Sequence, residues 1–355
     1  MSEISSTAIP SALSTVALPV EARLRTLLES EQARWTAIDA DLAAPLAVLS
    51  SFVLDGGKRL RPAFCHWAFV GAGGSPDDPR IIDAGAAFEL LHAFALVHDD
   101  VMDGSSTRRG EPTVHIKFEA THAEQQWNSE PRRFGEGVAI LVGDLAEVYA
   151  DRLMTGSPTE AFGVWNELKI ELNIGQFLDV LGAARGHVDL QTARRIVRYK
   201  SGKYTIERPL HVGAALAGRL SDLEAPLSHY GEPLGEAFQL RDDILGTFGD
   251  SAKTGKPVGD DLREGKPTPM LAIANERANK HQQLTLERVG APDLSIEEIG
   301  ELQSVFIATE ALAEVERSIH ELTEQALAAL AHTNLTPKAL DALHDLAVYV
   351  GARDI

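Results

Sequence analysis

Two short clusters of aspartate are the residues in this sequence best suited to bind a metal ion. They are DDVMD (99–103) and the aspartates of DDILGTFGD (242–250), and each follows an apolar segment with helical spacing. Residues four apart share one helix face, so the carboxylates of Asp99 and Asp103 should project together, about 6 Å apart along the axis. Carboxylates this close repel unless a cation lies between them, and Mg²⁺ binds one or two carboxylates together with water and substrate phosphate. One such cluster is usually a solvated helix end, but two clusters after apolar helices favour a magnesium site.

Basic residues accompany both clusters. Arginine suits bidentate contact with phosphate, and lysine adds a point charge. Each such residue alone is more often a solvated surface group than a ligand. Grouped beside the aspartates, they predict a site where diphosphate and Mg²⁺ lie between carboxylates and cations. The candidates are Lys58, Arg59 and Arg61 in GGKRLRP (56–62), Arg108 and Arg109 after the first cluster, Lys200 and Lys203 in KSGKYT (200–205), and Lys256 and Lys266 in a late polar stretch.

The composition excludes several classes of protein. The 355 residues include 33 Lys and Arg against 52 Asp and Glu, and the resulting net charge of −19 argues against a nucleic-acid partner. We find no run of about 18 apolar residues, so we expect no membrane span. The single cysteine, Cys65, excludes an intramolecular disulfide and fits a reducing, cytoplasmic location.

The elements that must position these residues are predicted to be helices. Apolar residues recur at helical spacing, as at Leu24 and Leu28, whereas alternating β-branched runs are missing. We therefore predict an all-α protein with one domain over residues 21–355, preceded by a loose tail over residues 1–20 that contains Ser and Pro. The polar segment 249–269 is too long for an ordinary connection and is typical of a functional lid.

The motifs, taken in order, resemble those of one enzyme family. From Gly56 to Leu271 the chain carries GGKRLRP, DDVMDGSSTRRGEPTVH, LVGD, GQFLD, KSGKYT, FQLRDDILGTFGD and TGKPVGDDLREGKPTPML. This set resembles the trans-isoprenyl diphosphate synthases of the polyprenyl synthetase family, most of all the geranylgeranyl diphosphate synthases. The resemblance implies a single-domain isoprenoid-synthase helical bundle around a central cavity, usually as a homodimer. It also implies a Mg²⁺-dependent head-to-tail joining of isopentenyl diphosphate to dimethylallyl, geranyl or farnesyl diphosphate, by ionisation, condensation and elimination.

The resemblance assigns the metal site to particular residues. Asp99 and Asp103 would bind two Mg²⁺ ions, and Asp242 would bind a third, all bridging to the allylic diphosphate. Supporting positions behind them would be Asp100, Gln176, Asp179 and Asp243. The positions with catalytic roles would be Asp99, Asp103, Asp242, Lys200 and Arg108.

The resemblance also assigns the substrate contacts. The allylic diphosphate would be held by Arg108, Lys200 and Lys256. Isopentenyl diphosphate would be held by Lys58, Arg61, His92 and Arg109. Further substrate-binding positions would be Ser201, Gln239 and Lys266. The released diphosphate would accept the proton, so no side chain is assigned as general base, and the ring of Phe238 or Tyr204 would either stabilise the carbocation or belong to the core.

The second acidic cluster departs from the family pattern at one position. The family commonly has aspartate at the fifth position of a DDxxD motif, where this chain has Gly246. Either Asp250, one turn further on, takes its place, or the contact passes through water. Because the other matched positions are intact, we expect the activity to survive this change.

Two residues before the first cluster bear on product length. By resemblance, an aromatic residue at the position of Phe94 closes the floor of the elongation cavity in geranylgeranyl-type members, and five helical residues span about 7.5 Å. A helical wheel instead points Ala95 more directly along the face of Asp99. We expect geranylgeranyl diphosphate as the product, with farnesyl diphosphate or a longer polyprenyl diphosphate as alternatives.

Three other functions fit part of the pattern. A class I terpene synthase shares DDxxD, but its second motif is normally an Asn/Ser/Glu set that this chain lacks. A metal phosphohydrolase is suggested by the adjacent His98 and Asp99, but the chain does not contain the further histidines of such an enzyme in the required order. A non-catalytic subunit of a prenyl synthase usually loses the acidic clusters, and here both survive.

Overall fold

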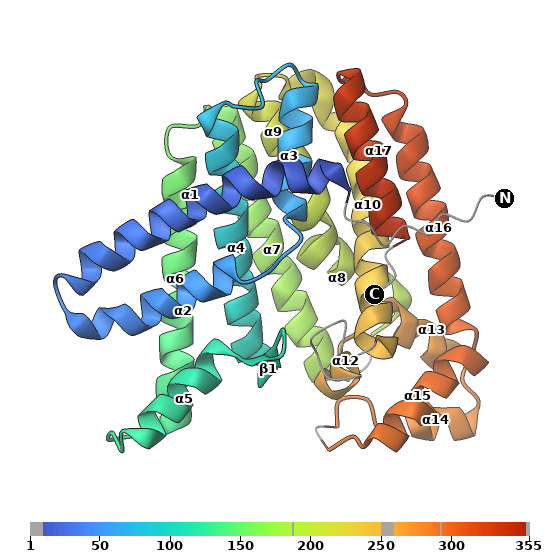
Figure 1. The fold of residues 1–355 in the computed structure, drawn as a ribbon. Coiled ribbons are helices and arrows are strands. Elements are labelled where there is room, and N and C mark those ends of the chain that lie inside the picture. The colour runs from blue at the N-terminus through green and yellow to red at the C-terminus, as the bar shows by residue number, and fades with distance from the viewer. Residues whose placement is uncertain (1–9, 187, 250–258, 292, 353–355) are drawn as a thin grey trace.

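The computed structural model describes residues 10–352 except 187, 250–258 and 292 (Figure 1). Almost all regular structure in these residues is helical. Their one small sheet pairs β1 (Thr107–Arg108) with β2 (Glu111–Pro112) in antiparallel register. The prediction of an all-α protein is confirmed.

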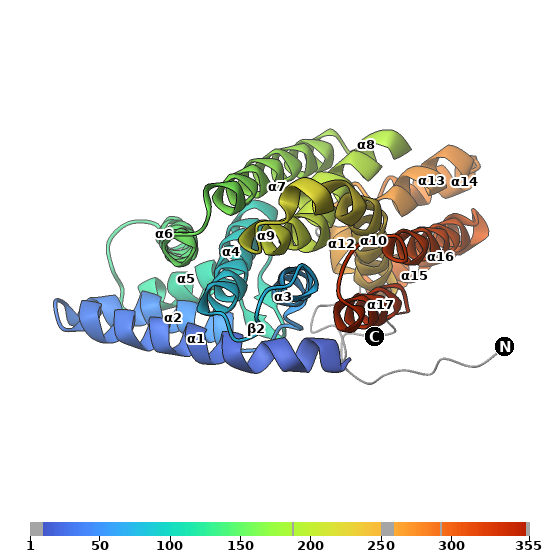
Figure 2. The same ribbon diagram turned by 90° about the horizontal axis from the view of Figure 1, so that it is seen from above.

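Long helices run roughly alongside one another and form the body of the bundle (Figures 1 and 2). Their starts carry ordinary signals. At α4, for example, the side chain of Asp78 accepts a hydrogen bond from the backbone of Arg80, and Pro79 occupies the first turn. The helices of the body are α3 (Leu60–Gly71), α4 (Pro79–Asp103), α6 (Pro131–Met154), α7 (Thr159–Arg185), α8 (Leu190–Ile196), π-helix η2 (Val197–Glu207), α9 (Arg208–Leu216) and α10 (Leu220–Phe248), with α5 (Val114–Glu124) beside α6.

The expected loose tail is wrong from residue 11 onward. Helix α1 (Ser11–Thr36) begins there, and η1 (Ala40–Leu42) and α2 (Ala43–Leu54) follow it along one side of the bundle (Figure 2). Leu13, Val16 and Val20 are buried, and the indole of Trp67 donates to the carbonyl of Ala12 at 2.9 Å. The apolar residues recur at helical spacing, so burial against α3 and α4 outweighs the Ser and Pro content that suggested a tail.

The C-terminal helices form a second packed group beside α10. Leu302 and Phe306 are fully buried within it, and Ile244 of α10 joins the same cluster. Its elements are α12 (Asp260–Glu264), α13 (Pro269–Arg277), α14 (Lys280–Leu286), α15 (Ile296–Ala308) and α16 (Ala311–Leu330). Helix α17 (Pro337–Gly351) returns to pack against α3 and α10.

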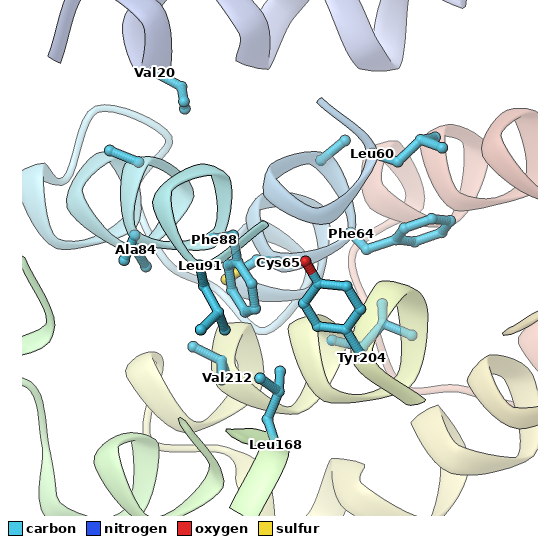
Figure 3. Close-up of a cluster of buried hydrophobic side chains, with 14 of the residues drawn as sticks. Val20, Leu60, Phe64, Cys65, Ala84, Phe88, Leu91, Leu168, Tyr204 and Val212 are labelled. Carbon is cyan, nitrogen blue, oxygen red and sulfur yellow. The ribbon is translucent and has the colours of Figure 1, made fainter. Parts of the chain in front are cut away.

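Aromatic and branched side chains join the central helices (Figure 3). Phe64 of α3, Phe88 of α4 and Leu168 of α7 are almost completely buried. The ring of Phe88 meets Trp165 edge to face, with centroids 5.3 Å apart. Burial of each such side chain contributes about 2 kcal/mol. This core fixes the relative positions of α3, α4 and α7, and each of these helices carries one of the motifs.

Helix α4 is long and apolar enough to cross a membrane by length and composition, with a mean hydropathy of 1.4 in its most apolar window. However, 61% of that window is buried within the protein. A core helix passes the same test, and α4 ends in an aspartate cluster. Helix α4 is therefore only weak evidence for a membrane-spanning segment, and the expectation that the chain has no such segment stays a prediction.

Candidate active site

A cavity of about 540 Å³ brings together most of the residues singled out in the sequence. It is bounded by the start of α3, the C-terminal parts of α4 and α10, the helices α7 and η2, and segment 261–268. The predicted central cavity is therefore present. The predicted positions on its wall are Lys58, Arg61, His92, Ala95, Asp99, Arg108, Arg109, Gln176, Asp179, Lys200, Ser201, Gln239, Asp242, Asp243 and Lys266.

Asp99 and Asp103 lie together, as the helical spacing predicts, and Asp179 of α7 joins them. Each carboxylate offers one oxygen, and these three atoms lie within 4.8 Å of one another. Oδ2 of Asp103 is buried without a hydrogen-bond partner among the described residues. Burial raises the pKa of Asp103 to about 7, and the charge of Asp99 adds to this effect. Carboxylates crowded in this way suit a hard divalent cation, so the donor set fits Mg²⁺ and places Asp179 among the candidate ligands.

Lys200 lies between carboxylates of two helices. Its Nζ atom is 2.9 Å from Oδ1 of Asp99 and also pairs with Oδ2 of Asp179. The amide of Gln176 donates to the same Oδ1 of Asp99 at 3.0 Å. Burial acts to raise the pKa of Asp99, but the surrounding cations, Lys200 foremost, outweigh it and hold that pKa well below its usual range. Asp99 is therefore ionised at neutral pH.

Arg108 provides a second cation at the first cluster. Its Nε atom donates to Oδ1 of Asp100 at 2.8 Å, and its Nη2 atom is 3.4 Å from Oδ2 of Asp99. Asp100 is buried and, unlike Asp99, is not on the wall of the described cavity. The short β-ribbon that carries Arg108 is tied to the end of α4, because the hydroxyl of Thr113 donates to the carbonyl of Ser105 at 2.8 Å.

Lys266 connects the late polar segment to the first cluster. Its Nζ atom is 2.6 Å from Oε2 of Glu264, 3.2 Å from Oδ1 of Asp261 and 3.8 Å from Oδ2 of Asp103. The hydroxyl of Ser105, just after α4, donates to Glu264. The described part of the late segment is therefore docked against the mouth of the cavity by charged contacts.

Across the cavity, Asp242 and Asp243 of α10 occupy different environments. Both line the cavity, but Asp243 is the buried one and accepts a hydrogen bond from Gln239 at 2.7 Å. Burial raises the pKa of Asp243 to about 7, although the bond from Gln239 opposes the shift. Two positions of this region that the sequence analysis singled out, Lys256 and Asp250, lie outside the described residues.

A glycine loop and a buried ion pair shape the cavity wall at the start of α3. Arg59, the residue just before α3, has a left-handed φ of 54°, a strained conformation for a residue with a side chain. Its guanidinium is buried, pairs with Glu89 of α4, and donates to the carbonyl of Val53 at 3.0 Å. This pair anchors the turn that places the flanking Lys58 and Arg61 on the cavity wall.

His92, Arg61 and Tyr204 form one packed group. The Tyr204 hydroxyl is 2.9 Å from Nδ1 of His92, and the guanidinium of Arg61 lies 4.2 Å from the centre of the Tyr204 ring. Arg61 also donates to the hydroxyl of Thr205 at 3.0 Å. Burial holds the pKa of His92 well below its usual range, and nearby arginines add to this effect, so His92 is neutral. Arg109 is anchored beside this group by the carbonyl of Asp55 at 2.8 Å.

A π-helix presents Lys200, Ser201 and Tyr204 to the cavity. The stretch η2 covers 11 residues, and its wider turns rotate successive side chains differently from an α-helix. It crosses α7 closely at Gly175, where an added Cβ atom would lie 2.3 Å from the backbone nitrogen of Lys200. Only glycine permits this approach, which brings Lys200 within reach of Asp179.

Below the aspartates the cavity becomes apolar. Ala95 and Leu96 of α4 and Leu172 of α7 line this part, together with Phe238 of α10. Phe94 is not among the described residues that line it, and its ring instead packs against His98 with centroids 4.7 Å apart. The helical-wheel expectation for Ala95 is met, whereas Phe94 as the floor of this cavity stays a prediction.

Some residues of the site were not identified from the sequence. Asp261, Glu89 and Thr205 line the cavity, and Glu264 pairs with Lys266 at its mouth. For Asp261 and Glu264 a signal existed, since GDDLREGK places acidic residues just before Lys266. For Glu89 the signal is its position three residues before His92, on the same helix face.

The fold and the cavity together define a class of enzyme, the all-α isoprenoid synthases. The family profile described as polyprenyl synthetase matches residues 45–305. The chain belongs to this family of trans-prenyltransferases, and the expected isoprenoid-synthase fold is confirmed.

Individual relatives agree with this assignment. A solved geranylgeranyl pyrophosphate synthase from Corynebacterium glutamicum, complexed with isoprenyl diphosphate and magnesium, is 37% identical with a TM-score of 0.92 over 97% of this chain and 100% of its own. A geranylfarnesyl diphosphate synthase from Aeropyrum pernix is 34% identical over 76% of this chain and 82% of its own. A geranylgeranyl diphosphate synthase from Sulfolobus acidocaldarius is 35% identical over 69% of this chain and 71% of its own.

Proposed function

We propose that this prenyltransferase joins isopentenyl diphosphate head to tail to dimethylallyl, geranyl and farnesyl diphosphates, and that its main product is geranylgeranyl diphosphate. The observation that carries the proposal is the pairing of carboxylates with cations at the first cluster. There Asp99, Asp103 and Asp179 alternate with Lys200, Arg108 and Lys266 above an apolar recess. This arrangement suits a diphosphate head group with a hydrocarbon tail.

The first chemical step is the departure of the allylic diphosphate. Lys200 and Arg108 would hold its oxygens, and their fixed positive charge favours the leaving group as its charge develops. Asp99, Asp103 and Asp242 would hold magnesium, with three ions as the expected number, and the bound metal would further neutralise that charge. The apolar lining of the cavity, which includes Leu96, Leu172 and Phe238, would limit access of water, which would otherwise quench the carbocation.

The second step is attack by isopentenyl diphosphate. Lys58, Arg61 and Arg109 would bind its diphosphate on the cavity wall, with His92 donating or accepting a hydrogen bond as a neutral ring. Both groups of cations line the same cavity, so the two reacting carbon chains would meet within it. The proton lost in the elimination would pass to the released diphosphate.

Product length should depend on the apolar part of the cavity. Ala95 is small and lies one helical turn below Asp99, so the growing chain has room to pass it. The names of the relatives span geranylgeranyl and geranylfarnesyl products, so farnesyl and longer products are the alternatives.

Product analysis tests the proposal directly. The protein is incubated with Mg²⁺, isopentenyl diphosphate and each allylic primer in turn, and the dephosphorylated products are separated by chromatography. We expect geranylgeraniol from every primer. A cyclic hydrocarbon would favour a terpene synthase, and inactivity until another protein is added would favour a non-catalytic subunit.

We also propose that the protein is a homodimer and acts in the cytoplasm. Apolar side chains are exposed on two neighbouring helices, α6 and α7, which are joined by an ion pair between Asp151 and Lys169 at 2.7 Å. The exposed residues are Ile140, Leu141 and Val148 on α6 and Phe162, Ile170, Ile174, Phe177 and Val180 on α7. A second copy of the chain would cover this surface.

A further inference from the structure

Gly246, the departure in the second acidic cluster, faces a carboxylate from another part of the chain. A Cβ atom added to Gly246 would lie 1.8 Å from Oδ2 and 2.4 Å from Cγ of Asp261. Heavy atoms do not approach this closely without a bond, so an aspartate at position 246 and the observed position of Asp261 exclude each other. The space that the fifth residue of a DDxxD motif would fill is therefore occupied by the carboxylate of Asp261.

The surroundings of Asp261 belong to the candidate active site. Asp261 is 8% exposed and lines the same cavity as Asp242, Asp243 and Gly246. Its Oδ1 atom is 3.2 Å from Nζ of Lys266. Asp261 therefore lies between α10 and a lysine that also approaches the first acidic cluster.

We propose that Asp261 replaces the missing fifth carboxylate and completes the magnesium–diphosphate site on the side of α10. The proposal rests on the proposed function, because it assumes that Mg²⁺ binds beside Asp242. Oxygen ligands, direct or through water, are what Mg²⁺ prefers, and Asp261 places one at the position that the sequence lacks. The carboxylate comes from α12, so metal binding would also hold α12 against α10.

The competing explanation is that Asp261 serves only as the counter-ion of Lys266. Exchanging the two residues separates these explanations. The variant Gly246→Asp with Asp261→Gly returns the carboxylate to α10 and removes the steric conflict. The matched variant Gly246→Asn with Asp261→Gly has the same shape without the charge.

The measurement is Mg²⁺ affinity in the presence of farnesyl thiolodiphosphate, an allylic analogue whose C–S bond resists ionisation, by isothermal titration calorimetry. Loss of a carboxylate that supports a metal usually weakens affinity about 10-fold or more, and we expect this for Asp261→Asn and Asp261→Gly. The charged exchange should restore affinity to within about 3-fold of the original protein, whereas the Asn exchange should not.

Controls keep each outcome interpretable. Asp260→Asn changes the neighbouring acidic residue, which is not among the described cavity-lining residues, and should leave Mg²⁺ affinity unchanged. Thermal melting of each variant reports whether it folds. If an exchange variant misfolds, the Mg²⁺ affinity of Asp261→Asn, which keeps the shape of the side chain, tests the proposal by itself. Wild-type affinity in Asp261→Asn, or equal recovery by the Asp and Asn exchanges, would overturn the proposal. If the original protein binds no Mg²⁺ with the analogue, the proposed function itself fails.

Discussion

Lys200 shows how a single side chain can serve both the resting site and the reaction. It pairs with Asp99 and Asp179, and these carboxylates raise the pKa of Lys200 although burial opposes the shift. Lys200 therefore stays charged across the physiological range. A permanent cation at this position favours the departure of a diphosphate without any change in protonation.

Lys200→Gln should lower kcat/KM for the allylic substrate about 100-fold, the usual effect of removing one fixed donor to a developing negative charge. The control is Arg198→Gln, which changes an exposed cation on the same π-helix that pairs with Glu232. Steady-state kinetics with farnesyl diphosphate as the varied substrate measure both. Equal activities of the two variants would remove Lys200 from the allylic site.

Ala95→Phe should shorten the product. A phenyl ring at this position would enter the apolar part of the cavity one turn below Asp99 and stop the chain early. Phe94→Ala is the paired variant and should lengthen the product if Phe94 closes the floor. Chromatography of the products from geranyl diphosphate tests both, and an unchanged product from Ala95→Phe would show that the chain grows elsewhere.

At the residue scale, the motifs predicted most of the charged residues on the cavity wall. A charged residue directly after an apolar helix is more often part of a site than one on a polar surface helix, so its position in the sequence was informative. The acidic residues before Lys266 were a signal for Asp261, but its contact with Gly246 could not be predicted, because that contact depends on how α12 docks against α10. Glu89 shares a helix face with His92, but its pairing with Arg59 could not be predicted, because Arg59 is buried by a left-handed turn that no spacing rule indicates.

Among the elements, α7 is held to its neighbours by a partly buried network of charges. Glu171 accepts hydrogen bonds from Arg208 of α9 at 2.6 and 2.7 Å and pairs with Lys203 of η2 at 3.1 Å. Burial acts to raise the pKa of Glu171, but Arg208 and Lys203 outweigh it and lower that pKa. The network thus positions the helix that carries Gln176 and Asp179.

This network should make stability depend on pH in the acid range. Because the pKa of Glu171 is lower in the folded than in the unfolded chain, its stabilisation is fully present above the ordinary glutamate pKa of about 4.3 and is lost as the pH falls through the folded-state value. Glu171→Gln should therefore lower the free energy of unfolding by about 2 kcal/mol at pH 7, the usual size of a hydrogen bond to a charged group. Urea unfolding between pH 7 and pH 3 should show that difference shrinking as the pH falls. A constant difference would contradict the assignment.

Helix periodicity predicted the type of the elements but not all of their limits. The start of α1 was missed, because Ser and Pro near residue 11 suggested a tail while the buried face of Leu13 and Val16 continues the helical pattern. The π-helix η2 was not predicted either. Its turns are wider than those of an α-helix, but the pattern of apolar residues in a short stretch of mixed polarity does not reveal the difference.

On the scale of the whole molecule, the exposed apolar surface of α6 and α7 predicts an interface. Phe177 is 65% exposed, Leu141 62% and Val148 61%, which is unusual for side chains of this size. Phe177→Asp should shift the protein from dimer to monomer, because a charge in an apolar interface is costly. Light scattering coupled to size-exclusion chromatography measures the mass.

The matched control is Ile296→Asp, which places the same charge on an exposed apolar residue of α15. It should leave the dimer intact. A monomeric original protein would contradict the proposed homodimer, and dissociation by both variants would place the interface elsewhere. The sequence alone could not identify this surface, since apolar helix faces look the same in a core and in an interface.

The ion pairs of the cavity have a further consequence for the order of events. Before substrate arrives, Lys200, Arg108 and Lys266 are already neutralised by the aspartates that are expected to hold magnesium. A diphosphate without bound magnesium would have to compete with these aspartates for the lysine and arginine side chains. A magnesium-bound diphosphate brings divalent ions with which the aspartates can pair instead. The aspartates thus act as internal counter-ions of the cavity. They should weaken the binding of metal-free diphosphates and polyphosphates relative to that of a magnesium–diphosphate complex.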